Sequence, residues 1–331
     1  IIFFLSLTSY ILIEKPFRNK NLISNKILII ILSIAASIIF SLNFYAIKKD
    51  GFSDRFPQIL NENFKQNPIA ALQDEEGYCF FHYPSKRNKF CHFYKDKSDK
   101  TLILVGDSVM QSIASSIKKD AFANNFNFLV MNSEGCYFAP NFKIPSDSKT
   151  LCSKEFQNRR YEEILNHPRA TIIIGGSLDY NYEQITNGND LNNFENSIKS
   201  HIKTLLNKNY KILHLNTLPR YSKNVSKELF SIIYKNGKSL NNKKFIFNNK
   251  EFILNIKLEE YLAMNKKSSL LFNELKNIKN KNYRIINPSQ LFCNDSVCEF
   301  NDYKKLFFYD EIHPSFTGSK MISNFIFKNI F

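Results

Sequence analysis

The sequence predicts an α/β domain with a central parallel sheet, preceded by a transmembrane helix. Two observations lead to this prediction. Residues 27–47 form a stretch of 21 residues without a charge, and from residue 101 onward short apolar runs alternate with segments of helical periodicity. The chain has 331 residues, of which 44% are hydrophobic. That length allows about two domains, and that composition excludes a wholly disordered chain.

The first fifty residues predict one membrane span and its orientation. Residues 1–13 are apolar but too short to cross a bilayer, so we expect them to be the end of a truncated upstream transmembrane helix. As a helix, residues 27–47 would span about 31 Å, the thickness of one hydrocarbon core. The alternative is a buried core helix. Residues 14–26 carry four basic residues and one acid, which makes them a cytoplasmic loop by the positive-inside rule. Residues from 48 onward are then expected across the membrane.

The six cysteines are expected to form disulfides, because all of them lie in the part of the chain predicted to leave the cytoplasm. Six cysteines allow fifteen pairings, and here they fall into three local pairs. The expected disulfides are Cys79–Cys91, Cys136–Cys152 and Cys293–Cys298. The alternative is a metal site with ligand-like spacing. Its ligands would be Cys79, His82, Cys91 and His92.

Beyond a linker or extension over residues 48–100, strands and helices are predicted in alternation. Short apolar runs predict strands at 101–105, 126–131, 171–174, 210–215 and 283–286. Apolar residues at helical spacing predict helices at 109–124, 191–206 and 315–330. Residues 221–282 are rich in Lys and Asn with irregular helical periodicity, which predicts a helical insertion. This alternation favours a parallel sheet with helices on both faces.

Two short segments carry candidate catalytic residues. Ser108 directly follows the first predicted strand, at the sheet edge where α/β domains bind ligands. Its hydroxyl can act there as a nucleophile beside a helix N-terminus, and the alternative is a helix N-cap. Asp310 and His313 precede the last predicted helix, and the carboxylate can orient the imidazole so that Nε2 serves as a base. The other histidines have no comparable partner in the sequence and are expected to have no such role. They are His82, His92, His167, His201 and His214.

The two segments together resemble the SGNH (GDSL-like) hydrolase superfamily over roughly residues 100–331. Gly106-Asp107-Ser108 is similar to the first block of that family, and Asp310-x-x-His313 is similar to the last. The resemblance implies a three-layer SGNH-like catalytic domain over residues 101–331. It also implies a catalytic triad of Ser108, His313 and Asp310.

The same resemblance implies an oxyanion hole. Its donors would be the amides of Ser108 and Gly135, because Gly135 stands in a segment similar to the second block of the family. The third block departs from the family pattern, since Ser177 occupies the position of the usual asparagine. The loss of one such donor can cost about 10²–10³ in rate.

The N-terminal segments narrow the resemblance. The chain contains the motif Ile-Glu-Lys-Pro-Phe-Arg at 13–18, then a single further span, and then the segment 51–57 before the SGNH-like domain. This order is similar to the C-terminal part of acyltransferase-3 membrane proteins fused to SGNH domains. Such proteins resemble bacterial O-acetyltransferases of surface glycans. The resemblance implies the bacterial inner membrane as the location, with residues from about 48 onward in the periplasm. It also implies acetyl-CoA as acyl donor to the upstream membrane domain, with no cofactor and no metal in the domain described above.

The predicted function is therefore acyl transfer, with acetyl implied by the resemblance, to a hydroxyl of lipopolysaccharide O-antigen, peptidoglycan or another glycan. The expected partners are the glycan acceptor, the lipid bilayer and the upstream membrane domain of the same chain. A carbohydrate O-acetyl esterase with the same triad and a non-catalytic glycan-binding domain are the alternatives. Asp179 and Tyr180 are expected either to line the acceptor cleft or to pack in the core.

The net charge of +15 favours a Lys-rich surface of no special role, and the alternative is attraction to acidic glycans or anionic lipids. The basic residues form no compact run with interleaved aromatics. We therefore expect no nucleic-acid partner.

Overall fold

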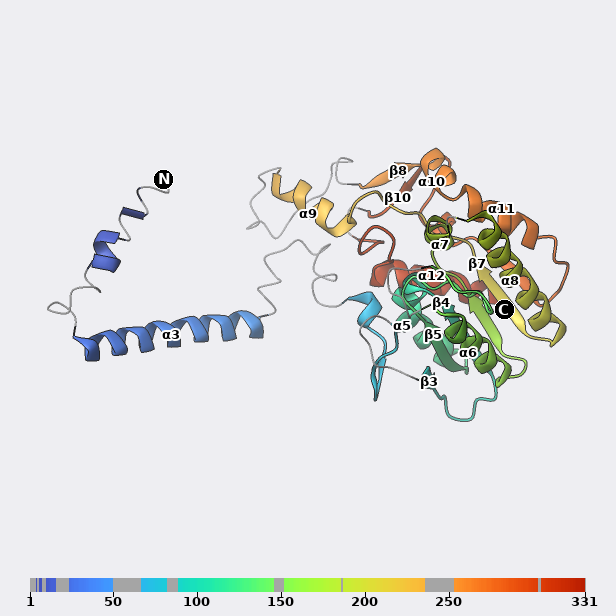
Figure 1. The fold of residues 1–331 in the computed structure, drawn as a ribbon, viewed down its shortest axis with the longest axis horizontal. Coiled ribbons are helices and arrows are strands. Elements are labelled where there is room, and N and C mark those ends of the chain that lie inside the picture. Colours follow the sequence, from blue (N-terminus) through green and yellow to red (C-terminus); the bar gives the residue numbers. More distant parts are fainter. Residues whose placement is uncertain are drawn as a thin grey trace. The chain divides into compact units, whose positions relative to one another are not determined.

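The computed structural model divides into two compact units, residues 1–55 and residues 56–331 (Figure 1). The structure describes residues 4, 6–7, 10–15, 24–49, 67–81, 89–145, 152–185, 187–235, 253–302 and 305–330.

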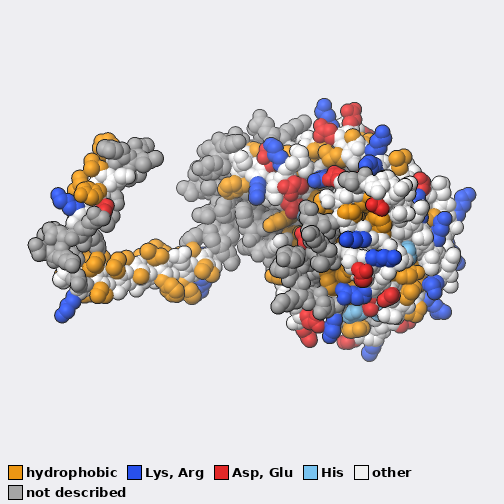
Figure 2. All heavy atoms as spheres, viewed as in Figure 1, with side chains coloured by type: hydrophobic (Ala, Val, Ile, Leu, Met, Phe, Trp, Pro, Cys, Tyr) orange, Lys and Arg blue, Asp and Glu red, His pale blue; other side chains and the backbone are white. Residues whose placement is uncertain are grey.

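The first unit contains a long apolar helix, α3 (Asn25–Lys48). It begins after Ser24, whose Oγ accepts a hydrogen bond from the amide of Ile27. Apolar side chains are exposed along the whole helix, as Figure 2 shows, and Ile47 is 75% exposed. In the part of the chain that the structure describes, residues 26–48 form the one helix long and apolar enough to cross a membrane by length and composition.

A short π-helix, η1 (Tyr10–Glu14), lies ahead of α3. Much of the predicted segments 1–13 and 14–26 lies outside the described residues, as does the whole of 51–57.

The second unit is built on a six-stranded sheet in the order β3-β5-β4-β6-β7-β9. The last five strands of that order are parallel and correspond to the five predicted strands. They are β5 (Asn127–Asn132), β4 (Thr101–Gly106), β6 (Thr171–Ile174), β7 (Lys211–Leu215) and β9 (Tyr283–Ile286). Their order along the sheet, 2-1-3-4-5 by chain position, reverses direction between β4 and β6, which is where doubly wound sheets bind ligands.

Strand β3 (Cys91–Phe93) makes the sheet mixed rather than wholly parallel. It pairs antiparallel with β5 at the edge of the sheet, with His92 opposite Leu129. This strand lies in the segment 48–100, for which the sequence predicts a linker or extension and no strand of the sheet.

Helices cover both faces of the sheet, which gives three layers (Figure 1). Side chains alternate along β4, so that Leu102 and Leu104 join one core cluster while Ile103 and Val105 join the other. The first cluster is completed by α5 (Ser108–Ala123) and α12 (Phe316–Ile330). The second is completed by α6 (Lys154–Leu165), α8 (Gly188–Asn207) and α11 (Lys266–Leu275).

The sequence does not predict helix α6 or helix α7 (Leu178–Gln184). The buried face of α6 contains Gln157 and Arg160 beside Phe156 and Ile164, so its periodicity is not that of an apolar stripe. Ser153 begins the helix by accepting a hydrogen bond from the amide of Phe156.

Residues 67–81 pack against the sheet as an extension. They form η3 (Pro68–Ala70) and a hairpin of β1 (Gln73–Asp74) and β2 (Gly77–Tyr78). The Cys79–Cys91 disulfide joins this extension to β3. The amide of Phe81 donates to the carbonyl of Asn132 at the end of β5, at 3.1 Å.

The predicted helical insertion over 221–282 contains three helices and a short strand, and residues 236–252 within it lie outside the described residues. These elements are α9 (Val225–Lys235), β8 (Asn255–Lys257), α10 (Leu258–Met264) and α11. Strand β8 pairs antiparallel with β10 (Val297–Glu299), which follows η5 (Pro288–Leu291). The Cys293–Cys298 and Cys136–Cys152 disulfides are also present, so all three cysteine pairs match the expected pairing.

Candidate active site

The turn after β4 places Ser108 at the carboxyl edge of the sheet. Gly106 is required there, because a Cβ at this position would lie 2.2 Å from the carbonyl oxygen of Gly175 at the end of β6. Asp107 is the N-cap of α5, and its Oδ1 accepts from the amide of Val109 at 2.8 Å. Ser108 is therefore the first residue of the helix, and it is half-buried.

The loop before α12 brings His313 to Ser108. The Asp310 carboxylate accepts hydrogen bonds from the amides of Ile312 and His313, at 3.0 and 2.9 Å, which folds the loop around it. Nδ1 of His313 lies 2.8 Å from Oδ2 of Asp310, and Nε2 lies 2.7 Å from Oγ of Ser108. The Asp310 and His313 side chains are each only 16% exposed. The structure thus brings together the three residues predicted as a triad.

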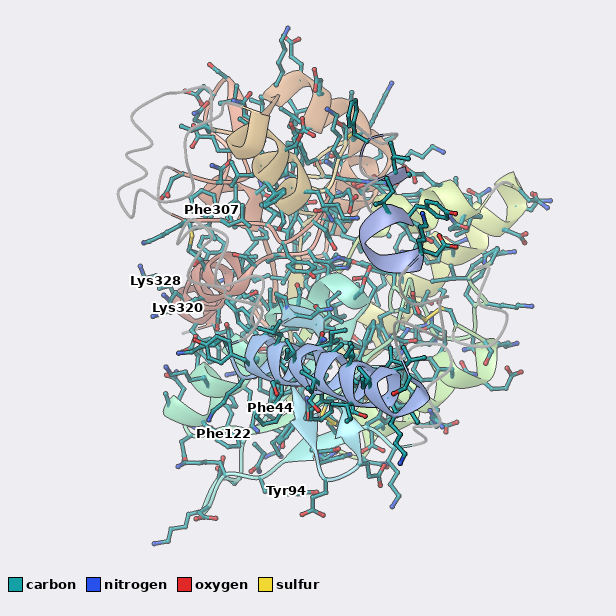
Figure 3. The ribbon with its side chains drawn as sticks, turned by 90° about the vertical axis from the view of Figure 1, so that its left-hand side faces the viewer. Phe44, Tyr94, Phe122, Phe307, Lys320 and Lys328 are labelled. Carbon is teal, nitrogen blue, oxygen red and sulfur yellow. A yellow bond between two sulfur atoms is a disulfide. The ribbon has the colours of Figure 1, made fainter. Side chains whose placement is uncertain are left out.

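Helix α12 holds this loop by a close approach to the preceding chain. A Cβ at Gly318 would lie 2.1 Å from the carbonyl oxygen of Phe307. Lys320 and Lys328 lie on the exposed side of the same helix (Figure 3). The position of His313 therefore depends on a tight contact between backbone segments, which only glycine allows.

The two carboxyl groups near Ser108 have opposite pKa shifts. Burial alone would raise the pKa of Asp310, but hydrogen bonds and the charge of His313, with two backbone amides, outweigh it and lower that pKa. Burial raises the pKa of Asp107, although the amides of Ser177 and Val109 oppose the shift. Asp310 is therefore the better ionised partner for a developing imidazolium on His313.

The predicted oxyanion donors follow the two strands that flank β4. Gly135 comes after β5 with a φ of +58°, and Ser177 comes after β6. The amide of Ser177 donates to Oδ2 of Asp107 at 2.6 Å, so it is already engaged. Within the described residues, the amides of Ser108 and Gly135 make no hydrogen bond. This arrangement favours those two amides as donors and leaves only the hydroxyl of Ser177 for such a role.

Arg160 supports the loop that contains Gly135, and sequence reasoning did not find it. Its guanidinium is fully buried and donates to the carbonyls of Gly106, Cys136 and Tyr137, at 3.3, 3.2 and 3.0 Å. Burial lowers the pKa of Arg160 to about 9, and the Asp107 charge opposes this shift. Arg160 thus links the turn after β4 to the residues after Gly135, and no sequence motif marks it because α6 was not predicted.

A cleft of about 330 Å³ borders the Ser108 and His313 loops. Val109 and Ile312, each next to a triad residue, lie in its wall with Gly176 and Ser177. Polar side chains make up much of the remaining wall: Asp179, Glu183, Thr217, Arg220, Ser222 and Asn265.

Asp179 lies in the wall of this cleft and is half-buried. Burial raises the pKa of Asp179 to about 6, while hydrogen bonds from Ser268 partly oppose the rise. Arg220 and Glu183 form an ion pair at 3.3 Å. Tyr180 instead points toward Gly135, where its Cε1 would be 3.3 Å from an added Cβ.

Two observations concern the remaining histidines, and the second corrects a sequence expectation. Cys79 and Cys91 are joined in a disulfide, which excludes the metal site considered with His82 and His92; His82 itself lies outside the described residues. His92 and His167 do have a partner, since both approach the Glu163 carboxylate.

His214 is fully buried between the hydroxyls of Tyr137 and Tyr283, at 2.5 and 3.0 Å. Burial lowers the pKa of His214 to about 3. It is a neutral core residue. His201 packs against Tyr161 on the surface side of α8.

Comparison with known proteins gives the family of this domain. Residues 78–328 match the family model of the SGNH domain (fused to AT3 domains). The periplasmic domain of a lipopolysaccharide acetyltransferase from Salmonella ser. Paratyphi A is 16% identical with a TM-score of 0.48, over 70% of this chain and 84% of that domain. A GDSL-like lipase from Bacteroides thetaiotaomicron is 13% identical with a TM-score of 0.41, over 70% of this chain and 88% of the lipase. No curated protein sequence matches the chain.

Proposed function

Because the chain belongs to the family of SGNH domains fused to AT3 domains, we propose that it transfers an acyl group to a hydroxyl of a cell-surface glycan. The acyl group is acetyl in this proposal, and the acceptor is lipopolysaccharide O-antigen, peptidoglycan or a similar polysaccharide. The observation that carries the proposal is the continuous chain of contacts from Asp310 through His313 to Ser108.

These contacts support nucleophilic catalysis. Asp310 holds Nδ1 of His313 protonated, so Nε2 can take the proton of Ser108 as its Oγ attacks the acyl carbonyl carbon. The amides of Ser108 and Gly135 stabilise the oxyanion. As the tetrahedral intermediate collapses, the imidazolium returns the proton to the leaving group of the donor, and an ester remains on Ser108.

The second half of the reaction needs an acceptor hydroxyl at the same site. His313 removes the proton of that hydroxyl, its oxygen attacks the ester carbon, and Ser108 leaves with the proton from the imidazolium. The polar cleft beside the triad suits a sugar, since hydroxyl, amide and charged side chains line it. An acyl acceptor in this cleft would be next to Val109 and Ile312, the chain neighbours of Ser108 and His313.

The apolar helix supports a location at a membrane. A helix of 23 residues with exposed apolar side chains needs a nonpolar surrounding, and its length suits one bilayer crossing. In this proposal the membrane is the bacterial inner membrane, and the SGNH domain with its three disulfides lies in the periplasm. An upstream AT3 domain takes the acyl group from acetyl-CoA and delivers it to Ser108, and the SGNH domain itself uses no cofactor for the transfer.

Mass spectrometry of surface glycans from cells carrying the full-length protein tests this proposal. Wild type, Ser108→Ala, a deletion and the control Ser115→Ala are compared; Ser115 lies in the same helix, α5, outside the triad. Loss of the acyl mass in Ser108→Ala and in the deletion, with full acylation in Ser115→Ala, is the expected result.

Two other results would replace the proposal. Extra acyl groups on the glycans of the Ser108→Ala cells would make the protein an O-acetyl esterase. Unchanged acylation in Ser108→Ala, with loss in the deletion, would mean that this domain binds the glycan without catalysing the transfer.

A further inference from the structure

A second cluster of chemically active side chains lies on the sheet edge, apart from the triad. It consists of His92 in β3, Glu163 in the last turn of α6 and His167 in the turn that follows α6. One ligand atom from each residue lies within 4.8 Å of the other two. None of the three residues contacts Ser108, Asp310 or His313, so the acyl-transfer mechanism gives this cluster no role.

The backbone directs His92 toward the other two residues. Cys91 and Phe93 face the core cluster that contains α5 and α12, and Phe93 stacks on Phe128 at 6.3 Å. Because side chains alternate along a strand, His92 must face the opposite side of the sheet, where α6 packs. Glu163 and His167 are four residues apart, so they meet at the C-terminal end of α6.

The distances in the cluster suit a tetrahedral metal ion. Nε2 of His92 lies 3.4 Å from Oε1 of Glu163, and Nε2 of His167 lies 3.2 Å from the same oxygen. Nitrogen and oxygen ligands about 2.0–2.1 Å from a tetrahedral zinc ion are separated from each other by about 3.3–3.4 Å. The two measured separations fall close to this value, and both imidazoles present the same ring atom to one point.

A neighbouring side chain orients the Glu163 carboxylate. Nδ2 of the Asn166 side chain donates to Oε2 of Glu163 at 3.4 Å, which leaves Oε1 turned toward the two imidazoles.

The cluster is also open to solvent on one side. The side chains of His92, Glu163 and His167 are 29%, 23% and 23% exposed. A small cavity of about 80 Å³ has both histidines in its wall, together with Tyr94. The Tyr94 ring stacks on His92 at 6.2 Å and lies at the border of the domain (Figure 3). Glu163 does not line this cavity, which gives an ion a path to the two imidazoles.

We propose that His92, Glu163 and His167 bind a Zn²⁺ ion that joins the edge strand β3 to helix α6. This departs from the sequence expectation that the domain holds no metal. The ion ties together two elements that are 71 residues apart in the chain, counted from His92 to Glu163. Its binding to the folded state alone stabilises the domain as the zinc concentration rises.

Isothermal titration of the full chain in detergent with ZnCl₂ tests the proposal, using metal-free protein with an affinity tag that lacks histidine. The expected result is one Zn²⁺ per chain in wild type. Three variants should each weaken zinc binding at least about 100-fold: His92→Gln, His167→Gln and Glu163→Gln. The loss of a direct metal ligand should cost at least as much affinity as the loss of a residue that only hydrogen-bonds to a ligand. Two control variants should bind as wild type: Glu162→Gln, the exposed neighbour in α6, and His201→Gln, a histidine on α8.

A second measurement separates metal ligation from folding. Co²⁺ substituted for Zn²⁺ should give the intense visible absorption of four-coordinate cobalt in wild type and not in Glu163→Gln. Circular dichroism of each variant without metal establishes that it is folded. Absence of binding to the wild-type chain, binding that survives in all three ligand variants, or equal loss in the two control variants would overturn the proposal.

Discussion

Replacement of Asp179 by asparagine is expected to stabilise the protein at pH 8 and to destabilise it slightly at pH 4. The carboxylate of Asp179 is half-buried at the cleft and accepts hydrogen bonds from the hydroxyl and amide of Ser268, at 2.9 and 3.4 Å. Burial nevertheless raises the pKa of Asp179 from its ordinary value of 3.8 to about 6. Folding therefore disfavours the ionised form of this group.

The size of the effect follows from linkage. A folded-state pKa above the unfolded value means that the contribution of Asp179 to stability is fully present below pH 3.8 and is lost as the pH rises through about 6. This pKa difference corresponds to about 3 kcal/mol. Asparagine cannot ionise and avoids that loss, but it gives up one Ser268 hydrogen bond at a cost of about 1 kcal/mol at every pH. The variant should thus be more stable than wild type by about 2 kcal/mol above pH 7 and less stable by about 1 kcal/mol below pH 4.

Urea unfolding of the full chain between pH 4 and 8, followed by circular dichroism, measures this difference. Asp96→Asn, at an exposed aspartate, is the matched control, and its difference from wild type should not change with pH. If Asp179→Asn differed from wild type by the same amount at pH 4 and at pH 8, the reasoning about burial of this carboxylate would be refuted.

Two further predictions concern the groups around Ser108. Asp310→Asn should reduce the acyl-transfer rate by about 10³–10⁴, because asparagine stabilises the wrong tautomer of His313, while circular dichroism shows an unchanged fold. Transfer at the wild-type rate would contradict this role. Arg160→Met should lower the free energy of unfolding in urea by about 3 kcal/mol, because the charged hydrogen bonds to the carbonyls of Gly106, Cys136 and Tyr137 are lost. The carbonyl of Cys136 then loses its donor, while those of Gly106 and Tyr137 keep the amide of Ser133 and the side-chain amide of Gln157. A change below about 1 kcal/mol would contradict the importance of those bonds.

The strands and the candidate triad could be predicted because their signals are local. An apolar run such as 101–105, bounded by a charge and a glycine, has few alternatives to a buried parallel strand. Once strand ends and the last helix are known, Ser108 and the Asp310–His313 pair must lie at the same edge of the sheet. Their contact at 2.7 Å follows from the topology rather than from either segment alone.

The features that sequence reasoning missed depend on contacts between distant segments. Helix α6 buries Arg160 and Gln157, which a periodicity of apolar residues cannot detect. The hydrogen bond from the Ser177 amide to Asp107 joins residues 70 positions apart. The sequence could therefore place Ser177 in the third block, but it could not show that its amide is already bonded to Asp107.

The His92, Glu163 and His167 cluster was missed for a related reason. Glu163 and His167 are four residues apart, which was the one visible signal, but it needed the assignment of α6 as a helix. His92 was considered only with the cysteines next to it in the chain. The disulfide between Cys79 and Cys91 removes those ligands, and the antiparallel pairing of β3 turns His92 toward α6 instead.

The central claim is that Ser108 carries the acyl group during transfer, and peptide mass spectrometry tests it most directly. Trypsin should release residues 101–118, which include Ser108 and three other serines that fragmentation can distinguish. In protein from cells that supply the acyl donor but lack the acceptor glycan, we expect an acyl group on Ser108 in wild type and none at this position in His313→Ala. An unmodified Ser108 in a wild-type preparation that then acylates added glycan would contradict the account.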